Sequence, residues 1–182
     1  SPPPGSRLLT PDSRTGTPMV ATASTMLPLG TPAPHFSLLN AADGATVSLD
    51  HLSGHKALLV MFICNHCPFV IHVRDELTSI AADYAERGLA IAAVNSNSEK
   101  THPQDGPPHM KTLAAELGWG FPFLFDEDQS VAKAYGAACT PDFYVFDADL
   151  LLAYRGQLDS SRPGNSMPVT GQDLRAAIDA IL

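Results

Sequence analysis

The sequence predicts an α/β protein: a three-layer sandwich with a central mixed β-sheet flanked by helices and an N-terminal β-hairpin. Two observations lead to this expectation. Residues 57–63 and 89–94 are almost continuously apolar, which is typical of strands buried on both faces. The full order of expected elements is hairpin, β-α-β unit, helices, hairpin and helix, and this order favours helices packed against one sheet.

A single domain is expected over residues 27–182, because two full domains would be cramped in a chain of 182 residues. The preceding residues 1–26 are proline-rich and show neither a strand period nor a helix period, so we expect a flexible leader. Met19 is a candidate natural start, in which case residues 1–18 are an upstream extension or a remnant of expression.

The first half of the domain alternates strand and helix patterns. Two short segments flank the turn at 40–44 and predict the hairpin, namely 36–39 and 46–49. After the first buried strand, apolar residues at helical spacing predict a helix over 69–84, followed by Gly88 as a C-terminal cap. The second buried strand comes next, so this half contains a complete β-α-β unit.

The second half consists of shorter elements. A polar, proline-rich segment at 96–109 predicts a surface loop. Apolar clusters then predict a helix, a strand and a helix, at 110–117, 121–125 and 131–135. Two apolar segments on either side of residues 147–149 predict a second hairpin, at 143–146 and 150–154. Thr170-Gly171-Gln172-Asp173 has the form of a capping box and predicts the start of a final helix.

Composition excludes several classes of function. A net charge of −8 without a cluster of Lys or Arg argues against nucleic-acid binding. No apolar run approaches the roughly 20 residues of a membrane span. Three cysteines, two of them in one tetrapeptide, do not form a secreted disulfide framework, and no secretory signal pattern is present. We therefore expect a cytoplasmic protein, although a mature exported form would look the same.

Cys64-Asn65-His66-Cys67-Pro68 lies where the first buried strand gives way to the helical pattern. A Cys-x-x-Cys at such a junction is typical of a dithiol redox site, because the two thiols lie about one helical turn apart. Cys64 is the expected nucleophile because it comes first, at the mouth of the helix, where the helix terminus favours a thiolate. Cys67 is expected a turn inside the helix, as the resolving thiol. A zinc-binding or purely structural pair is the alternative, but zinc normally needs four ligands and Cys139 is the only other cysteine in the sequence.

His66 is the third candidate catalytic residue. A histidine next to the dithiol can stabilise the Cys64 thiolate and thereby make the disulfide more oxidising. The alternative is a solvent-facing side chain without a role. The remaining histidines show no metal-binding spacing.

The order of the expected elements along the chain, with this dithiol after the first long strand, resembles the thioredoxin superfamily. Residues 30–38 resemble the opening of its redoxin branch, which includes the AhpC/TSA, peroxiredoxin-like proteins. Thr140-Pro141, directly before the late hairpin, is a further point of resemblance. The resemblance covers residues 27–182. It implies a thioredoxin-like fold with a cis-proline at Pro141 facing the dithiol, and a substrate groove lined by Phe69, Thr140 and Pro141.

The same resemblance would bring Cys139 near the dithiol as a candidate third thiol. Free cysteines are often small buried apolar residues, and we favour that interpretation here.

Two departures from related patterns are visible. The peroxiredoxin pattern P-x-x-x-T-x-x-C is absent, whether counted back from Cys64 or from Cys67. The strand before the dithiol also has no acidic residue, and Ile63 stands where thioredoxins have tryptophan. How the resolving thiol loses its proton is therefore left open by the sequence.

The predicted function is that of a thiol-disulfide oxidoreductase. Cys64 would attack a disulfide and Cys67 would release the product from the mixed disulfide. The expected partners are disulfide-containing proteins or small-molecule thiols and a separate reductant, and no metal or organic cofactor is expected beyond a redox-active Cys64–Cys67 disulfide. The alternatives are a peroxiredoxin-like thiol peroxidase and, less favoured, a copper-binding assembly factor, since thiolates bind Cu(I).

Overall fold

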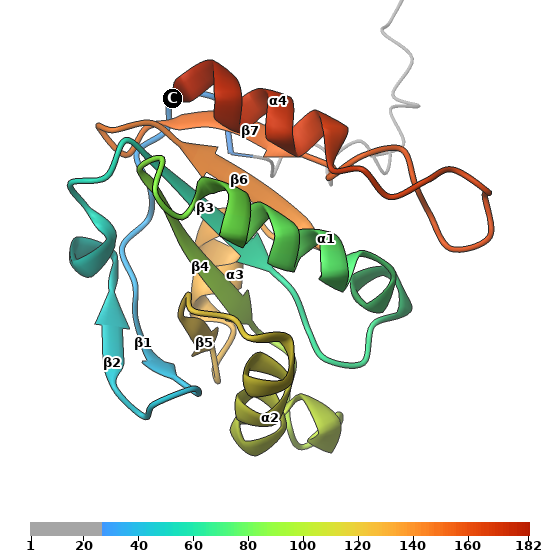
Figure 1. Ribbon diagram of the computed structural model, residues 1–182. Helices are drawn as coiled ribbons and strands as arrows, with labels where there is room; N and C mark the ends of the chain where they lie inside the picture. Colours follow the sequence, from blue (N-terminus) through green and yellow to red (C-terminus); the bar gives the residue numbers. More distant parts are fainter. Residues whose placement is uncertain (1–26) are drawn as a thin grey trace, which may run out of the picture.

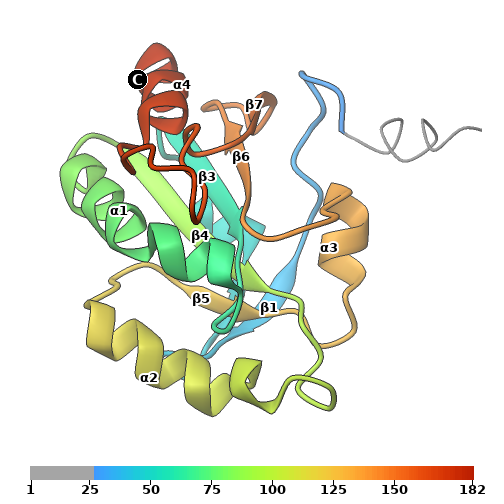
Figure 2. The same cartoon turned by 90° about the vertical axis from the view of Figure 1, so that its right-hand side faces the viewer.

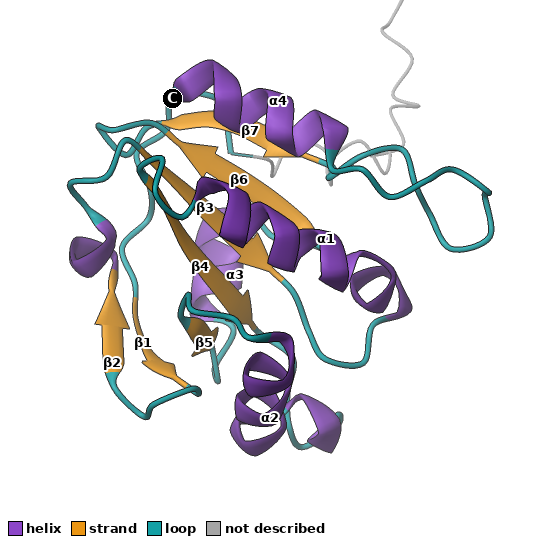
Figure 3. Cartoon of the chain, in the orientation of Figure 1, coloured by secondary structure: helices purple, strands orange, loops and turns teal. Residues whose placement is uncertain are grey.

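The computed structural model describes residues 27–182, and the predicted leader at 1–26 lies outside them. The described chain forms one seven-stranded mixed sheet with the order β2-β1-β5-β4-β3-β6-β7 (Figure 1, Figure 3). The strands are β1 (Ser37–Asn40), β2 (Thr46–Ser48), β3 (Ala57–Phe62), β4 (Leu89–Asn95), β5 (Phe123–Phe125), β6 (Asp142–Phe146) and β7 (Leu152–Gly156). Both predicted hairpins are present, as the antiparallel pairs β1–β2 and β6–β7.

The two predicted buried strands lie side by side at the centre of the sheet. β3 and β4 are parallel, and every residue of both strands is buried. Alternate side chains of β3 belong to two separate cores: Leu59 packs on one face of the sheet, and Val60 on the other. This double burial explains why both strands have nearly continuous apolar sequences.

Helices cover both faces of the sheet and confirm the three-layer sandwich (Figure 2). One face carries α1 (Pro68–Tyr84), α2 (Pro107–Leu117) and α4 (Gln172–Ile181). The other face carries α3 (Ser130–Tyr135). In the described part of the chain, no helix is both long and apolar enough to cross a membrane.

The final helix begins differently from the predicted capping box. Its N-cap residue is Gly171, with a positive φ of 69°, rather than Thr170. The reason is the carboxylate of Asp159, which accepts the backbone N–H groups of both Thr170 and Gly171 at 2.8 Å. The Thr170 hydroxyl still accepts the Gln172 N–H at 3.3 Å, so a tertiary contact adds to a local one at this helix start.

The segment at 96–109 is more than the predicted surface loop. It contains a short 3-10 helix, Pro103–Asp105, and α2 begins at Pro107, three residues earlier than expected. Asp105 is completely buried. The side-chain amide of Asn95, at the end of β4, donates to the carbonyl oxygen of Asp105 at 2.6 Å and holds the segment against the sheet. The segment thereby reaches the end of the sheet where the two cysteines lie.

Candidate active site

The two cysteines lie at the carboxyl end of β3, between the strand and α1. Cys67 is the N-cap residue of α1, and Cys64 lies three residues before it, outside the helix. The expectation that Cys64 lies at the mouth of the helix and Cys67 a turn inside it is therefore wrong. The helix starts about one turn later than that expectation requires, at Pro68, because proline lacks an N–H and suits the first helical position.

The thiols differ in exposure. All three cysteines are free; Cys64 is buried with 1% of its surface exposed, Cys67 is partly buried, and Cys139 is exposed. Burial raises the pKa of Cys64, a hydrogen bond with the Thr140 hydroxyl opposes the shift, and the charge of Asp105 adds to it. The Sγ–Oγ1 distance of that hydrogen bond is 3.5 Å. The expected thiolate character of Cys64 is thus outweighed by desolvation.

The exposure of Cys139 contradicts its interpretation as a buried apolar residue.

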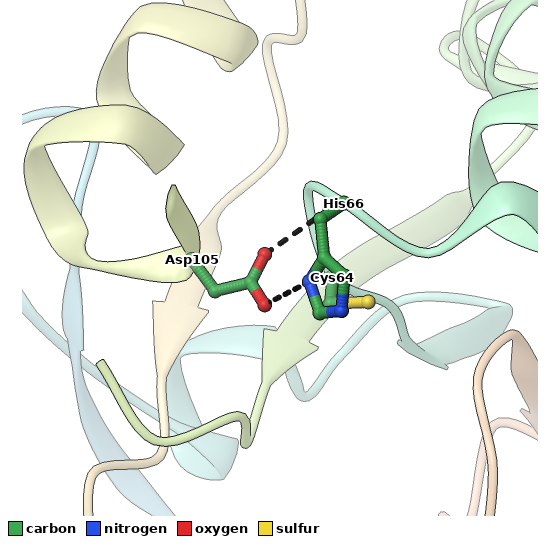
Figure 4. Close-up of side chains that lie close together, drawn as sticks. All are labelled: Cys64, His66 and Asp105. Atoms are coloured by element: carbon green, nitrogen blue, oxygen red, sulfur yellow. Dashed lines mark hydrogen bonds and ion pairs between the residues drawn. The ribbon is translucent and has the colours of Figure 1, made fainter. Parts of the chain in front are cut away.

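Asp105 is the residue that sequence reasoning missed. Its Oδ1 accepts the backbone N–H groups of Asn65 at 2.8 Å and His66 at 3.2 Å. Its Oδ2 accepts the side-chain amide of Asn97 at 2.9 Å and pairs with Nδ1 of His66. Figure 4 shows the His66 ring between this carboxylate and the Cys64 sulfur. A buried carboxylate therefore fixes the loop between the two cysteines and orients its histidine.

His66 is accordingly not a free solvent-facing side chain. About a third of it is exposed (32%), and its ring stacks on that of His102 with centroids 4.6 Å apart and an angle of 13°. One sequence signal for this cluster existed. The segment holding His102 and Asp105 follows β4, and carboxyl ends of neighbouring parallel strands meet at one edge of a sheet.

The cluster is a poor match for a metal site. One donor atom each from Cys64, His66 and Asp105 lie within 4.8 Å of one another. However, the carboxylate already accepts from two backbone N–H groups, an amide and the imidazole. Two uncommitted donors remain, whereas protein metal sites usually supply three or four. We assign no metal to it.

A groove lies on the other side of the dithiol. The three residues expected to form it, Phe69, Thr140 and Pro141, line a pocket of about 340 Å³ together with Cys139. The Thr140–Pro141 peptide bond is cis, as the resemblance implied. The Cys67 sulfur lies 3.7 Å from the Thr140 carbonyl oxygen, and Phe69 is half exposed. An accessible apolar surface thus adjoins the partly exposed thiol.

The family model described as Redoxin matches residues 28–174. The chain belongs to the Redoxin family. A solved structure of an uncharacterized conserved protein from Geobacillus kaustophilus is 56% identical with a TM-score of 0.84, covering 86% of this chain and 82% of that one. A curated relative, a putative peroxiredoxin of Mycobacterium tuberculosis, is 28% identical over 116 residues, which are 64% of this chain and 68% of the relative.

Thioredoxin-fold structures extend the likeness beyond close relatives. A putative thiol:disulfide interchange protein DsbE from Chlorobium tepidum has a TM-score of 0.66 at 19% identity, covering 85% of this chain and 98% of that one. At that identity the similarity concerns the fold alone. The Redoxin-family chain therefore has the thioredoxin-like fold, with its two spaced cysteines at the carboxyl end of β3.

Proposed function

We propose that this Redoxin-family protein is a thiol-disulfide oxidoreductase whose redox centre is the pair Cys64 and Cys67. The observation that carries the proposal is the position of two free thiols between β3 and α1, both in contact with Thr140 at the edge of an accessible groove. A thiolate there attacks a disulfide of the substrate, and the second thiol displaces the product as a Cys64–Cys67 disulfide forms. An external dithiol returns the pair to its reduced state.

The substrates we propose are disulfides of proteins or small thiols. Phe69 and Pro141 offer apolar contact surface, while the Thr140 backbone lies beside the Cys67 sulfur. The protein's own groups supply binding and positioning, and the dithiol supplies both electrons. No organic cofactor takes part in this scheme.

The test is turnover of a protein disulfide with dithiothreitol as the reductant. The Cys64→Ser/Cys67→Ser double variant is expected to lose all turnover above the dithiothreitol background, because it lacks both sulfurs. Cys139→Ser removes the third thiol and leaves the pair intact, so turnover above the dithiothreitol background is expected to persist. Turnover by the double variant would refute the proposal. The reduction potential of the pair in a glutathione buffer then gives the direction of electron flow.

A thiol peroxidase function is favoured by one observation, the name of the curated Mycobacterium tuberculosis relative, a putative peroxiredoxin. In that reaction a thiolate attacks one peroxide oxygen, and the resulting sulfenic acid condenses with the second thiol to a disulfide and water. We expect slow peroxide reduction, close to that of a free thiol, because the peroxiredoxin pattern is absent from the sequence. A stopped-flow rate with hydrogen peroxide far above that of a free thiol would favour the peroxidase instead.

A further inference from the structure

The two thiols of the pair are unequal in access and in their relation to the helix. Cys64 has 1% of its surface exposed, whereas Cys67 is partly exposed and its sulfur adjoins the groove. An attack on a bulky disulfide requires the sulfur to approach the substrate in line. Cys64 is covered on all sides, so of the two residues only Cys67 is open to solvent.

Cys67 also differs from Cys64 in its position relative to α1. It is the N-cap of the 17-residue α1, and its carbonyl oxygen accepts the N–H groups of Val70 at 3.0 Å and Ile71 at 2.9 Å. The partial positive charge of a helix N-terminus acts within its first turn. Cys64 lies before the helix, at the end of the strand. Its burial raises the pKa of its thiol, and hydrogen bonds with the Thr140 hydroxyl and the Cys67 backbone oppose that shift without cancelling it.

Cys64 instead has a base beside it. Its sulfur lies within 4.8 Å of a ring nitrogen of His66 and of an Asp105 carboxylate oxygen. Asp105 pairs with Nδ1 of His66 and so leaves Nε2 to accept a proton (Figure 4). His102 stacks on the ring, and Asn97 donates to the same carboxylate, so the imidazole is held in one orientation.

We propose that the thiols act in the reverse of their sequence order: Cys67 attacks the substrate, and Cys64 resolves the mixed disulfide after His66, positioned by Asp105, takes its proton. This inference rests on the proposed dithiol function. The Cys67 thiolate attacks one sulfur of the substrate disulfide, and the other sulfur leaves as a thiolate. Cys64 then gives its proton to His66 and attacks the Cys67 sulfur. The second substrate thiolate leaves and takes the proton from His66, so two electrons pass to the substrate.

The first test separates the two steps with a chromogenic aromatic disulfide, in protein carrying Cys139→Ser. Cys64→Ser is expected to release one coloured thiolate per protein and to retain a stable adduct on Cys67, located by peptide mass mapping. Cys67→Ser is expected to react with the disulfide at least about tenfold more slowly than Cys64→Ser. Faster or equal attack by Cys67→Ser would overturn the order of the thiols. Failure of both variants to react would overturn the proposed dithiol function itself.

A second measurement does not depend on the folding of the serine variants. The reduced Cys139→Ser protein is treated with less than one equivalent of iodoacetamide at neutral pH, and the label is mapped. The label is expected on Cys67. A label mainly on Cys64 would overturn the inference.

The role of His66 is tested on the second step alone. With the same chromogenic disulfide, His66→Ala is expected to slow release of the second coloured thiolate about tenfold and to change the first release by less than about twofold. Without the base, the second step depends on spontaneous ionisation, so its rate should rise about tenfold per pH unit from about pH 7 to about pH 8. The second step of the wild type should depend less steeply on pH than that of His66→Ala.

Two further variants complete this test. Asp105→Asn keeps the shape of the carboxylate without its charge and should slow the second step in the same direction as His66→Ala. Asp126→Asn is the matched control, since Asp126 is also completely buried but caps the start of α3 on the other face of the sheet. A second step in His66→Ala with the wild-type rate and pH profile would refute the role of His66.

Discussion

The two sides of the Cys64–Cys67 loop differ sharply in structure. The Cys64 side is closed: Asp105 is completely buried, and four hydrogen bonds tie its carboxylate to the loop and its surroundings. The Cys67 side is open, with half of the Phe69 surface exposed in a groove beside the cis-proline. One tetrapeptide therefore places one thiol in a polar, buried network and the other next to an open, largely apolar groove. The two thiols therefore differ in burial, in polar neighbours and in access to the groove.

The largest expected effect is a loss of folding stability when the Asp105 carboxylate on the Cys64 side is removed. Asp105→Ala removes the acceptor of two backbone N–H groups, an amide and the imidazole. We expect a loss on the order of 3 kcal/mol in the free energy of unfolding, because buried donors without partners carry their full desolvation cost. Urea unfolding of the reduced protein measures this loss. A change below about 0.5 kcal/mol would show that water replaces the carboxylate and that the network is not a structural one.

Asp126→Ala tests whether a loss of stability by itself lowers the rate of disulfide exchange. Asp126 is as buried as Asp105 and accepts from the Ser96 hydroxyl at 2.7 Å and the Ala132 N–H at 2.9 Å. We expect a comparable destabilisation. Below the unfolding transition, however, Asp126→Ala should leave the rate of disulfide exchange unchanged, whereas Asp105→Ala should lower it. Equal losses of rate in the two variants would mean that the network acts only through overall stability.

A smaller effect, on the rate with a protein substrate, is expected from a change in the groove on the Cys67 side. Phe69→Ala should lower kcat/KM for a protein disulfide about tenfold, since an exposed aromatic residue in a groove is a typical anchor for a partner. The rate with a small aromatic disulfide should change by less than about twofold. Ile71→Ala is the matched control, because Ile71 is similarly exposed on α1 (46%) but is not among the residues that line the groove. Equal effects of both substitutions would remove Phe69 from the docking surface.

The smallest expected effect concerns Thr140, which contacts both thiols. Thr140→Val deletes the hydroxyl that lowers the pKa of Cys64, so this pKa should rise further above its ordinary value of 9.0. Thr140→Ser keeps the hydroxyl and should leave it unchanged. Ultraviolet thiolate absorbance against pH, in protein where Cys64 is the sole cysteine, measures both. Identical titrations of the two variants would show that the hydroxyl has no influence on the thiol.

The raised pKa also sets the sign of a pH effect on stability. The folded state keeps the Cys64 proton at pH values where the unfolded chain has lost it. The resulting contribution is fully present below pH 9 and is lost as the pH rises through the higher folded-state pKa. Cys64→Ser should flatten this part of the stability curve. The free energy of unfolding in urea, measured for the wild type and for Cys64→Ser at several pH values above 9, tests this expectation.

The sequence alone determined the fold class and the position of the two spaced cysteines after the first buried strand. Strands β3 and β4 are buried on both faces, so their residues are apolar without interruption and could be recognised locally. Cys64 and Cys67 are close in sequence, and their spacing and position after a strand are local properties as well. The groove residues Phe69, Thr140 and Pro141 were predicted by resemblance, and the structure brings them together in one pocket.

Only the tertiary structure decided what surrounds each thiol. Asp105 is 41 residues from Cys64 along the chain, and no local pattern marks a buried carboxylate within a polar, proline-rich segment. Its position follows from the parallel pairing of β3 with β4, which brings the segment after β4 to the dithiol loop. The exposure of the two cysteines likewise depends on where α1 begins and on what packs over Cys64. Spacing in sequence shows that two thiols can pair, but long-range packing determines which of them meets the solvent.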